Sequence, residues 1–468
     1  MTSINAEKAG ILRLSGLIQK GRRRGAGVRT GSWKRGRKRS FEMEIDAGPF
    51  WLHCCATSMK PLLPLLCLAF AQSVLFAADW PQWRGAARDD HSPDKSILNP
   101  WPAQGPEQKW VNKDAGLGYA GFSVVGDSLF TMGAVDGGEQ VLCLNAVTGA
   151  KKWAVKLDDK VYPNQWGDGP RSTPTVDGDL LYALSANGIL GCMSVKDGSI
   201  LWKTSLVSDL GGEVPGWGYT ESVLVDGDKV ICTPGGSQGT MAAFDKKSGK
   251  LIWRSTVAKD GAQYSSPILF THNGQKQVAQ ILMRKVIGVN PDNGEILWEA
   301  KFPGATAVIP TPIYKDGHLY VTAGYGVGCQ LLKLGGKTPE VVYENNTMVN
   351  HHGGVILVDG KLYGHSDKGG WTCQDFMTGE TVWKNESLGK GAVGFAAGHL
   401  VCLDEKTGVV ALVEASPAGW KEKSRFTLAP QTTQRKPQGR IWVHPVIVNG
   451  NLYLRDQELI HCYDVKGS

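Results

Sequence analysis

Thirteen polar and aromatic residues fall in five short stretches of this chain, NQWGDGPR, WGYTE, AQYSSP, NHHGG and GRIWVHP. Together they offer carboxylates, guanidinium groups, imidazoles and aromatic rings, which could bind a planar cofactor, a sugar or a polymer chain. A second interpretation is a solvated channel mouth whose polar groups satisfy strand ends. The candidate binding residues are Asn164, Trp166, Asp168, Arg171, Trp217, Tyr219, Glu221, Tyr264, His351, His352, Arg440, Trp442 and His444.

These residues do not form a recognisable catalytic or metal motif. His351 and His352 are adjacent, so on a strand they would point to opposite faces and could not bind one metal ion without a bulge. Asn164, Asp168 and Glu221 could supply oxygen ligands to Ca²⁺, but no spacing places them together. No acid/base pair is identifiable, and no C-x-x-C or C-x-x-C-H occurs. We therefore assign no catalytic residue and no metal ligand.

The elements that position these stretches are repeats. Segments 141–153, 191–202, 241–253, 287–298 and 371–383 each read as a strand, a tight turn and a strand that ends in tryptophan. A tryptophan follows the turn glycine by four residues in every copy, which indicates a repeat architecture. We expect these tryptophans to cover the junctions between neighbouring units. The structural pairs are Gly149 with Trp153, Gly198 with Trp202, Gly249 with Trp253, Gly294 with Trp298, and Gly379 with Trp383.

Each unit contains alternating strands joined by Asp-Gly or Asn-Gly turns, as four-stranded antiparallel sheets require. An eighth, incomplete unit at 442–464 lacks an outer strand, which residues near 107–113 can supply. We predict an all-β, eight-bladed β-propeller that is closed by pairing its N- and C-terminal strands, with seven blades as the alternative. The seven complete units are expected at 117–153, 171–202, 217–253, 262–298, 306–343, 351–383 and 392–428.

The basic charge of the chain belongs to its beginning. Residues 1–58 hold 12 Lys and Arg against 4 acids, or +8, so the remaining residues carry +7 − 8 = −1. The near-neutral remainder has no basic cluster, which argues against nucleic-acid binding. We interpret 1–58 as a low-complexity leader absent from the mature protein, 59–78 as a Sec signal peptide, and 79–468 as one propeller domain. A monomer exported to the periplasm or outside the cell, without a transmembrane span, is expected. The alternative is a basic tail ahead of a membrane anchor.

The cysteines are predicted to be structural. Seven remain after residue 78, and an odd number is a poor disulfide framework. Cys143, Cys192 and Cys373 each lie six residues before a turn glycine, where other copies carry alanine or glycine. This position favours a small side chain packed between sheets.

The repeated turn and tryptophan resemble the pyrroloquinoline-quinone-like propeller repeat over about residues 80–466. The stretches DWPQWRG, GPRSTPTVDGD, WGYTESVLVDGDKVICTPGG and VEASPAGW are similar to those of secreted quinone-like propeller proteins. That superfamily includes quinoprotein alcohol dehydrogenases, among them polyvinyl-alcohol dehydrogenases, which hold the quinone with Ca²⁺. It also includes a quinone-free propeller lipoprotein of the outer-membrane β-barrel assembly machine. Fold alone does not choose between them.

The resemblance implies a vicinal cysteine pair over the cofactor in quinone enzymes, yet the only such pair here is Cys54 and Cys55, before the propeller. We therefore expect no cofactor and an exported binding or protein-interaction scaffold, with an envelope protein or a polymer or glycan as partner. The first alternative is a quinone-dependent alcohol or polymer dehydrogenase using pyrroloquinoline quinone and Ca²⁺. The second is a carbohydrate-binding or hydrolytic propeller.

Overall fold

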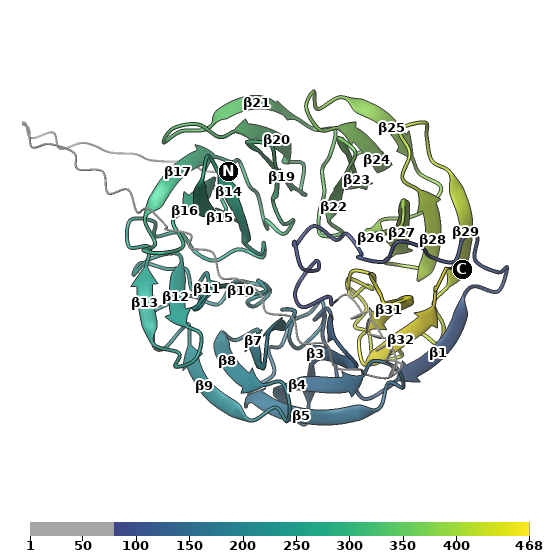
Figure 1. Ribbon diagram of the computed structural model, residues 1–468, viewed down its shortest axis with the longest axis horizontal. Helices are drawn as coiled ribbons and strands as arrows, with labels where there is room; N and C mark the ends of the chain where they lie inside the picture. The colour runs from purple at the N-terminus through teal and green to yellow at the C-terminus, as the bar shows by residue number, and fades with distance from the viewer. Residues whose placement is uncertain (1–78, 468) are drawn as a thin grey trace, which may run out of the picture. The chain divides into compact units, whose positions relative to one another are not determined.

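The computed structural model describes residues 79–467, in which every regular element is a β-strand. The predicted leader at 1–58 and signal peptide at 59–78 lie outside the described residues. Eight four-stranded antiparallel sheets surround a central axis (Figure 1). The predicted eight-bladed propeller is confirmed, and the seven-bladed alternative is wrong because the incomplete C-terminal unit does form a blade.

Seven blades consist of four consecutive strands that run from the axis outward (Figure 1). The first four blades are β2 (Ser123–Val125), β3 (Ser128–Val135), β4 (Gly138–Asn145) and β5 (Lys151–Asp158); β6 (Thr175–Asp177), β7 (Leu180–Leu184), β8 (Ile189–Ser194) and β9 (Ile200–Ser205); β10 (Leu224–Asp226), β11 (Lys229–Cys232), β12 (Ala242–Asp245) and β13 (Leu251–Arg254); and β14 (Ile268–His272), β15 (Gln275–Ile281), β16 (Lys285–Val289) and β17 (Ile296–Lys301).

The remaining blades follow the same plan, except that the last takes its outermost strand from the start of the described chain. They are β18 (Ile313–Lys315), β19 (His318–Ala323), β20 (Gly328–Lys333) and β21 (Glu340–Asn345); β22 (Val355–Val358), β23 (Lys361–Ser366), β24 (Gly370–Asp375) and β25 (Thr381–Asn385); β26 (Gly391–Ala396), β27 (His399–Asp404), β28 (Val409–Glu414) and β29 (Glu422–Thr427); and β30 (Val446–Val448), β31 (Asn451–Asp456), β32 (Leu459–Asp464) and β1 (Glu107–Asn112).

The ring closes where β1 pairs antiparallel with β32. Glu107 lies opposite Asp464 and Asn112 lies opposite Ile460, with a bulge between Gln108 and Trp110. Figure 1 shows the blue β1 beside the yellow β32. Because the two ends of the propeller share one sheet, neither end leaves a long unpaired edge.

Tight turns join the inner strands as the Asn-Gly and Asp-Gly pairs predict. Asn273 and Gly274 have φ angles of 49° and 77°, and Asp359 and Gly360 have 47° and 75°. Both central residues of each turn are thus left-handed, which matches the twist of the flanking strands. The core lies between blades: Phe130 and Met132 of one blade pack with the next blade's Leu181 and Met193, for example.

The repeated tryptophans couple successive blades, as predicted. Trp153 donates from Nε1 to the Val195 carbonyl of the next blade at 3.1 Å. Its ring also covers Gly198, where a Cβ would lie 2.7 Å from the ring. Trp202 and Trp253 repeat the arrangement, donating to the carbonyls of Lys246 and Pro291 at 3.1 and 2.8 Å. The glycine is therefore needed both for its turn and for the approach of the preceding tryptophan.

Trp298 departs from this pattern. The blade that follows it has lost the usual turn, and Trp298 instead donates to Gln277 Oε1 of its own blade at 2.7 Å. Its indole lies over Gly288, where a Cβ would come within 2.1 Å of the ring. Gly288 lies opposite the tryptophan, where four other blades carry cysteine, and this small residue leaves room for the turned indole. All seven cysteines of the described residues are buried and unpaired.

Residues 79–94, called the axial segment below, run into the centre of the ring (Figure 1). The segment bonds to a residue in or beside the innermost strand of every blade. The contacts are Trp80 with Val124, Pro81 with Val176, Arg88 with Ser222 and Val223, Arg88 with Pro267, Trp83 with Thr311, Arg84 with Val355, Ser92 with Phe395, and Asp94 with Asn449 and Gly450. The described residues include no helix long and apolar enough to cross a membrane.

Candidate functional site

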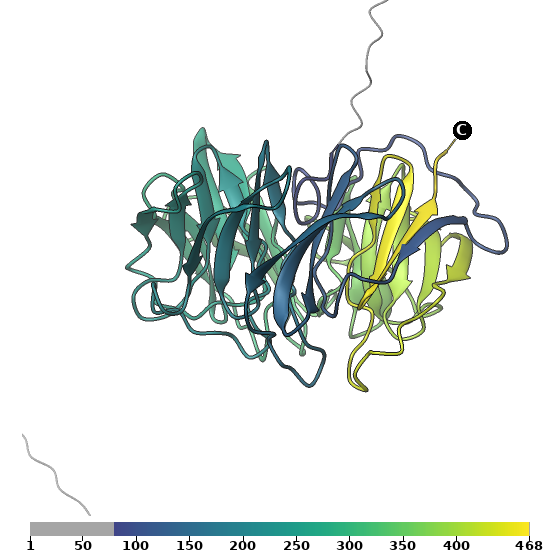
Figure 2. The same ribbon diagram turned by 90° about the horizontal axis from the view of Figure 1, so that it is seen from below.

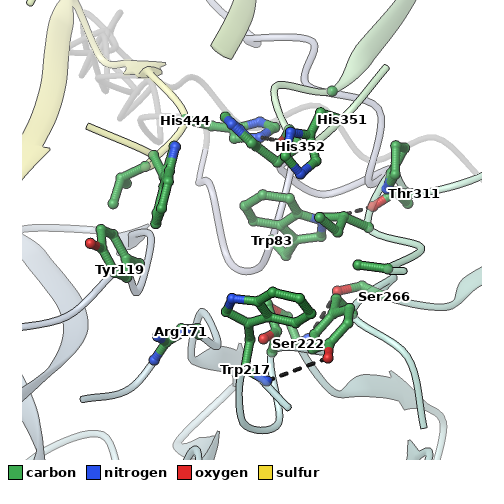
Figure 3. A pocket seen from close by; sticks show the side chains of 18 of the residues that line it. Trp83, Tyr119, Arg171, Trp217, Ser222, Ser266, Thr311, His351, His352 and His444 are labelled. Atoms are coloured by element: carbon green, nitrogen blue, oxygen red, sulfur yellow. Dashed lines mark hydrogen bonds between the residues drawn. The ribbon is translucent and has the colours of Figure 1, made fainter. Parts of the chain in front are cut away.

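A cavity of about 200 Å³ lies where the outermost strand of one blade leads to the innermost strand of the next. We call it the aromatic cup. Figure 2 shows the loops after β5 and β29 projecting from one face of the ring, and Figure 3 shows the cup itself. Its lining is Trp83, Arg84, Tyr119, Trp166, Arg171, Trp217, Thr220, Ser222, Tyr264, Ser266, Ala307, Ile309, Pro310, Thr311, Tyr325, His351, His352, Gly354, Trp442, Val443 and His444.

The loop between β5 and β6 shapes one wall of the cup. Asp168 accepts a hydrogen bond from the Asn164 amide at 2.7 Å and forms an ion pair of 2.7 Å with Lys436. Tyr119 donates to the Trp166 carbonyl at 2.5 Å, and burial raises the pKa of this tyrosine to about 12. A loop tied at both ends in this way presents Trp166 on a fixed backbone.

Arg171 supplies the cationic group of this wall. Its guanidinium donates to the carbonyls of Gly169 and Gly167 at 2.6 and 2.7 Å. It lies over the rings of Tyr119 and Tyr162, at 5.4 and 5.7 Å from their centroids. Among the ion pairs of residues 79–467, none joins Arg171 to a carboxylate. Burial lowers the pKa of the guanidinium, so the cup holds a desolvated cation without a direct anionic partner.

Histidines and their charged neighbours form the opposite wall. His351 Nδ1 lies 2.7 Å from Lys390 Nζ, and His351 Nε2 lies 2.8 Å from the Tyr325 hydroxyl. Burial, followed by the charges of His352 and Lys390, lowers the pKa of His351 to about 2, so the ring is neutral. His352 Nε2 lies 2.7 Å from Glu405 Oε2.

Glu405 also receives a hydrogen bond from Trp442 Nε1 at 3.2 Å. Burial acts to raise the pKa of Glu405. The pKa nevertheless lies below its ordinary value, because it is lowered by the hydrogen bond and charge of His352, the charge of Lys390 and the hydrogen bond from Trp442. The carboxylate is therefore ionised and fixes both His352 and the Trp442 indole at the wall.

The axial segment contributes residues that sequence reasoning missed. Trp83 donates to Thr311 Oγ1 at 2.9 Å, and its ring lies 4.6 Å from that of His444 (Figure 3). Arg84 pairs with Asp90 at 2.8 Å and donates to the Val355 carbonyl at 2.7 Å. The available signal was the Trp- and Arg-rich stretch DWPQWRG, which stands ahead of the repeats and follows no periodicity.

Eight of the thirteen candidate residues line the cup: Trp166, Arg171, Trp217, Tyr264, His351, His352, Trp442 and His444. Asn164 and Asp168 stabilise the loop beneath Trp166, and Arg440 donates to the carbonyls of Pro437 and Gly439 in its own loop. His351 and His352 lie in the loop before β22 and not on a strand, so the alternation of a strand does not apply to them, and both line the cup.

Tyr219 and Glu221 are packed inside the propeller. Tyr219 is 1% exposed and donates to the Pro234 carbonyl at 2.8 Å. Glu221 is 2% exposed and accepts from the Thr233 amide at 2.7 Å. Burial raises the pKa of Glu221 to about 7, against the hydrogen bonds of Thr233 and the charge of Arg88. Both residues therefore hold the scaffold next to the cup without lining it.

The lining residues do not fit a quinone held with Ca²⁺. No aspartate, glutamate or cysteine is among them. Calcium takes carboxylate and carbonyl oxygens as ligands, and the nearby carboxylates of Asp168 and Glu405 are engaged by Lys436 and His352. The cup instead offers aromatic faces, imidazoles and one guanidinium.

Comparison with known proteins identifies related sequences. A family model described as outer membrane protein assembly factor BamB matches residues 101–205 and 137–385. Tetrathionate hydrolase of Acidithiobacillus ferrooxidans is 23% identical over 207 residues, 42% of this chain and 40% of that protein. BamB of Bordetella pertussis is 27% identical over 141 residues, 30% of this chain and 31% of that protein. The chain thus spans less than half the length of these two relatives. BamB of Yersinia pestis is 21% identical over 345 residues, 71% of this chain and 70% of that protein.

Solved structures share the fold. BamB from Moraxella catarrhalis superposes with a TM-score of 0.55 at 17% identity, covering 77% of this chain and 98% of that one. Quinohemoprotein alcohol dehydrogenase from Comamonas testosteroni gives 0.58 at 12% identity, covering 84% and 81%. At such identities the likeness concerns the propeller alone.

Proposed function

The chain belongs to the BamB-type family of pyrroloquinoline-quinone-like β-propeller repeat proteins, and on that premise we propose that it is an exported binding scaffold that works without quinone. Its partner is a component of the cell envelope, either a protein or a polymer or glycan. The aromatic cup is the binding site. The related BamB proteins are outer membrane assembly factors by name, which supports an envelope location for this chain.

The observation that carries this proposal is the convergence of eight candidate residues, from five separate loops, on one cavity. Trp166 and Trp217 each lie more than 200 residues before Trp442 in the sequence, yet all three line the same space. Binding sites are typically concave and apolar, with a few placed polar groups. Large aromatic rings supply much contact area at a low entropic cost, since each has two side-chain torsions.

The electrostatics of the cup favour binding over redox catalysis through a quinone. Its lining carries no carboxylate to hold Ca²⁺. Several of its polar groups are held by contacts within the protein, as in the Glu405–His352 pair at 2.7 Å. The site is therefore preorganised, which lowers the entropic cost of binding.

Site-specific photo-crosslinking tests the proposal. Trp217 would be replaced with p-benzoylphenylalanine in the exported protein, and Val147, in the turn between β4 and β5 and 63% exposed, would be replaced as the matched control. We expect a discrete crosslinked species from position 217, competed by unlabelled wild-type protein, and none from position 147. The cup would be refuted as the binding site by equal products from positions 217 and 147, or by the absence of a product both at 217 and at Ile309, a second lining position.

A further inference from the structure

We propose that the aromatic cup recognises an acidic sugar ring, with Tyr325 donating a hydrogen bond to a ring oxygen or hydroxyl and Arg171 binding the acidic group. This inference rests on the proposed function and names the ligand class of the same site. The first observation that supports it is a chain of polar contacts, which fixes where the protons of His351 and Tyr325 lie.

The chain starts at Asp367, whose Oδ1 lies 2.7 Å from Lys390 Nζ. Lys390 Nζ also lies 2.7 Å from His351 Nδ1. An ammonium group can only donate, so His351 Nδ1 accepts. The neutral imidazole then carries its proton on Nε2, which donates to the Tyr325 oxygen at 2.8 Å. The hydroxyl proton of Tyr325 consequently stays available to a ligand.

Tyr325 is held in an unusual backbone conformation. Its φ angle is 56°, in the left-handed region that non-glycine residues rarely adopt. The residue is 42% exposed and is among those that line the cup. The turn packs closely on the histidine, because a Cβ at Gly324 would lie 2.8 Å from His351 Cα. Such a conformation persists only where the surroundings impose it, and it is enriched at ligand sites.

Arg171 provides donors on another side of the cup. It comes from the loop before β6, whereas Tyr325 lies in the turn between β19 and β20, three blades further along the ring. A guanidinium has five N–H donors, and two are used by Gly167 and Gly169, so 5 − 2 = 3 remain. No ion pair joins it to a carboxylate of residues 79–467, so it is suited to a ligand anion.

The ligand must therefore present acceptor oxygens toward separate blades and an apolar face toward the indoles. A sugar ring fits, since oxygens surround it and its C–H groups form an apolar face. A carboxyl group on that sugar would meet Arg171. A flat aromatic acid would also stack on the indoles, but its binding would not depend on a hydrogen bond from Tyr325. The dependence of binding on Tyr325 therefore distinguishes acidic sugars from aromatic acids.

Isothermal titration of the purified exported protein would test this with a galacturonate oligosaccharide, the matched galactose oligosaccharide and 2-naphthoate. The variants are Tyr325→Phe, Arg171→Gln, Lys390→Met and Lys390→Arg. Tyr343→Phe is the control, since its hydroxyl bonds to the Phe376 carbonyl at 2.9 Å and does not line the cup.

We expect the galacturonate oligosaccharide to bind and Tyr325→Phe to weaken it roughly three- to tenfold, the effect of one neutral hydrogen bond. Arg171→Gln should weaken it about ten- to a hundredfold, as for a bond to a charged group, and should hardly change binding of the galactose oligosaccharide. Lys390→Met should weaken binding of the galacturonate oligosaccharide as much as Tyr325→Phe does, and the double variant should show no further loss of affinity. Lys390→Arg should restore the affinity that Lys390→Met loses.

Three results would overturn this inference. Binding of 2-naphthoate alone would reject the sugar class, and so would no binding by any probe; in both cases a crosslink from position 217 would leave the proposed function standing. Sugar binding that is unchanged in Tyr325→Phe and Arg171→Gln would reject the assigned contacts. If the crosslink is also absent, the proposed function fails as well.

Discussion

Arg88 Nη1 donates a hydrogen bond of 2.8 Å to the carbonyl oxygen of Pro267, which joins the start of the described chain to the loop before β14. The same nitrogen donates to the Ser222 carbonyl at 3.0 Å, and Nη2 donates to the Val223 carbonyl. Arg88 is 4% exposed, and burial lowers its pKa to about 9 against the charge of Glu221. The axial segment thus uses a buried cation to connect two neighbouring blades.

Arg88→Met should consequently destabilise the propeller by about 3 kcal/mol or more, because it leaves three buried carbonyls without this donor. Urea unfolding monitored by tryptophan fluorescence would measure the loss. Arg440→Met is the control, since Arg440 bonds only within its own loop, and it should change stability by less than about 0.5 kcal/mol. Equal effects of the two variants would show that the axial segment does not hold the ring together.

Glu221 should make stability depend on pH. Burial raises its pKa in the folded state to about 7 from an ordinary value of 4.5. The folded protein therefore holds this proton more tightly than the unfolded chain, so the contribution is fully present below pH 4.5 and is lost as pH rises through 7. The shift of 7 − 4.5 = 2.5 corresponds to roughly 3 kcal/mol.

Urea unfolding of wild type and Glu221→Gln at pH 5, 6, 7 and 8 would isolate this effect, because other titrating groups cancel in the difference. The stability of wild type relative to the variant should fall by up to about 3 kcal/mol between pH 5 and pH 8. Parallel pH curves for the two proteins would contradict the raised pKa.

The contact between Trp253 and Gly294 should contribute strongly to stability. Trp253 is 7% exposed, and its indole would lie 2.5 Å from a Cβ at Gly294, whose φ is 75°. Trp253→Ala should cost roughly 3–5 kcal/mol. Gly294→Ala should cost about 1 kcal/mol for its left-handed backbone and more for the clash.

Gly261→Ala is the matched glycine control, because a Cβ there meets nothing within 4 Å. Thermal unfolding should leave Gly261→Ala near wild type and lower the midpoint of both other variants. A Gly294→Ala protein as stable as Gly261→Ala would mean that the tryptophan can move aside without loss, and that the repeat signature is not a coupling between blades.

The fold was predictable because its signals repeat. The contact of Trp153 with Gly198 has counterparts in later blades, so the sequence repeats the same packing requirement several times. Trp83 and Arg88 occur once, ahead of the first repeat, and their partners, Thr311 and Pro267, are separated from them by 228 and 179 residues. No local pattern reveals such contacts.

The cup was predictable only in part for a related reason. Its residues come from irregular loops, which lack the two-residue alternation that tells the inner face of a strand from the outer one. Trp217 and Tyr219 are two residues apart, yet the first lines the cup and the second is buried in the core. Composition identified the loops, and only the packing separates ligand-facing from structural residues.

Trp217 and Tyr219 therefore provide a matched pair of variants. Tyr219→Ala removes a ring that is 1% exposed and a hydrogen bond of 2.8 Å to Pro234, so it should cost roughly 3–5 kcal/mol. Trp217→Ala removes a half-buried ring whose edge packs on Tyr264 at 5.6 Å between centroids, and it should cost about 1 kcal/mol.

Differential scanning calorimetry would measure both losses of stability. Titration with the galacturonate oligosaccharide, at a temperature where both variants are folded, would measure binding. Trp217→Ala should abolish binding while the melting temperature stays close to that of wild type. The reverse result, a large loss of stability at Trp217 and none at Tyr219, would show that the cup is part of the structural core.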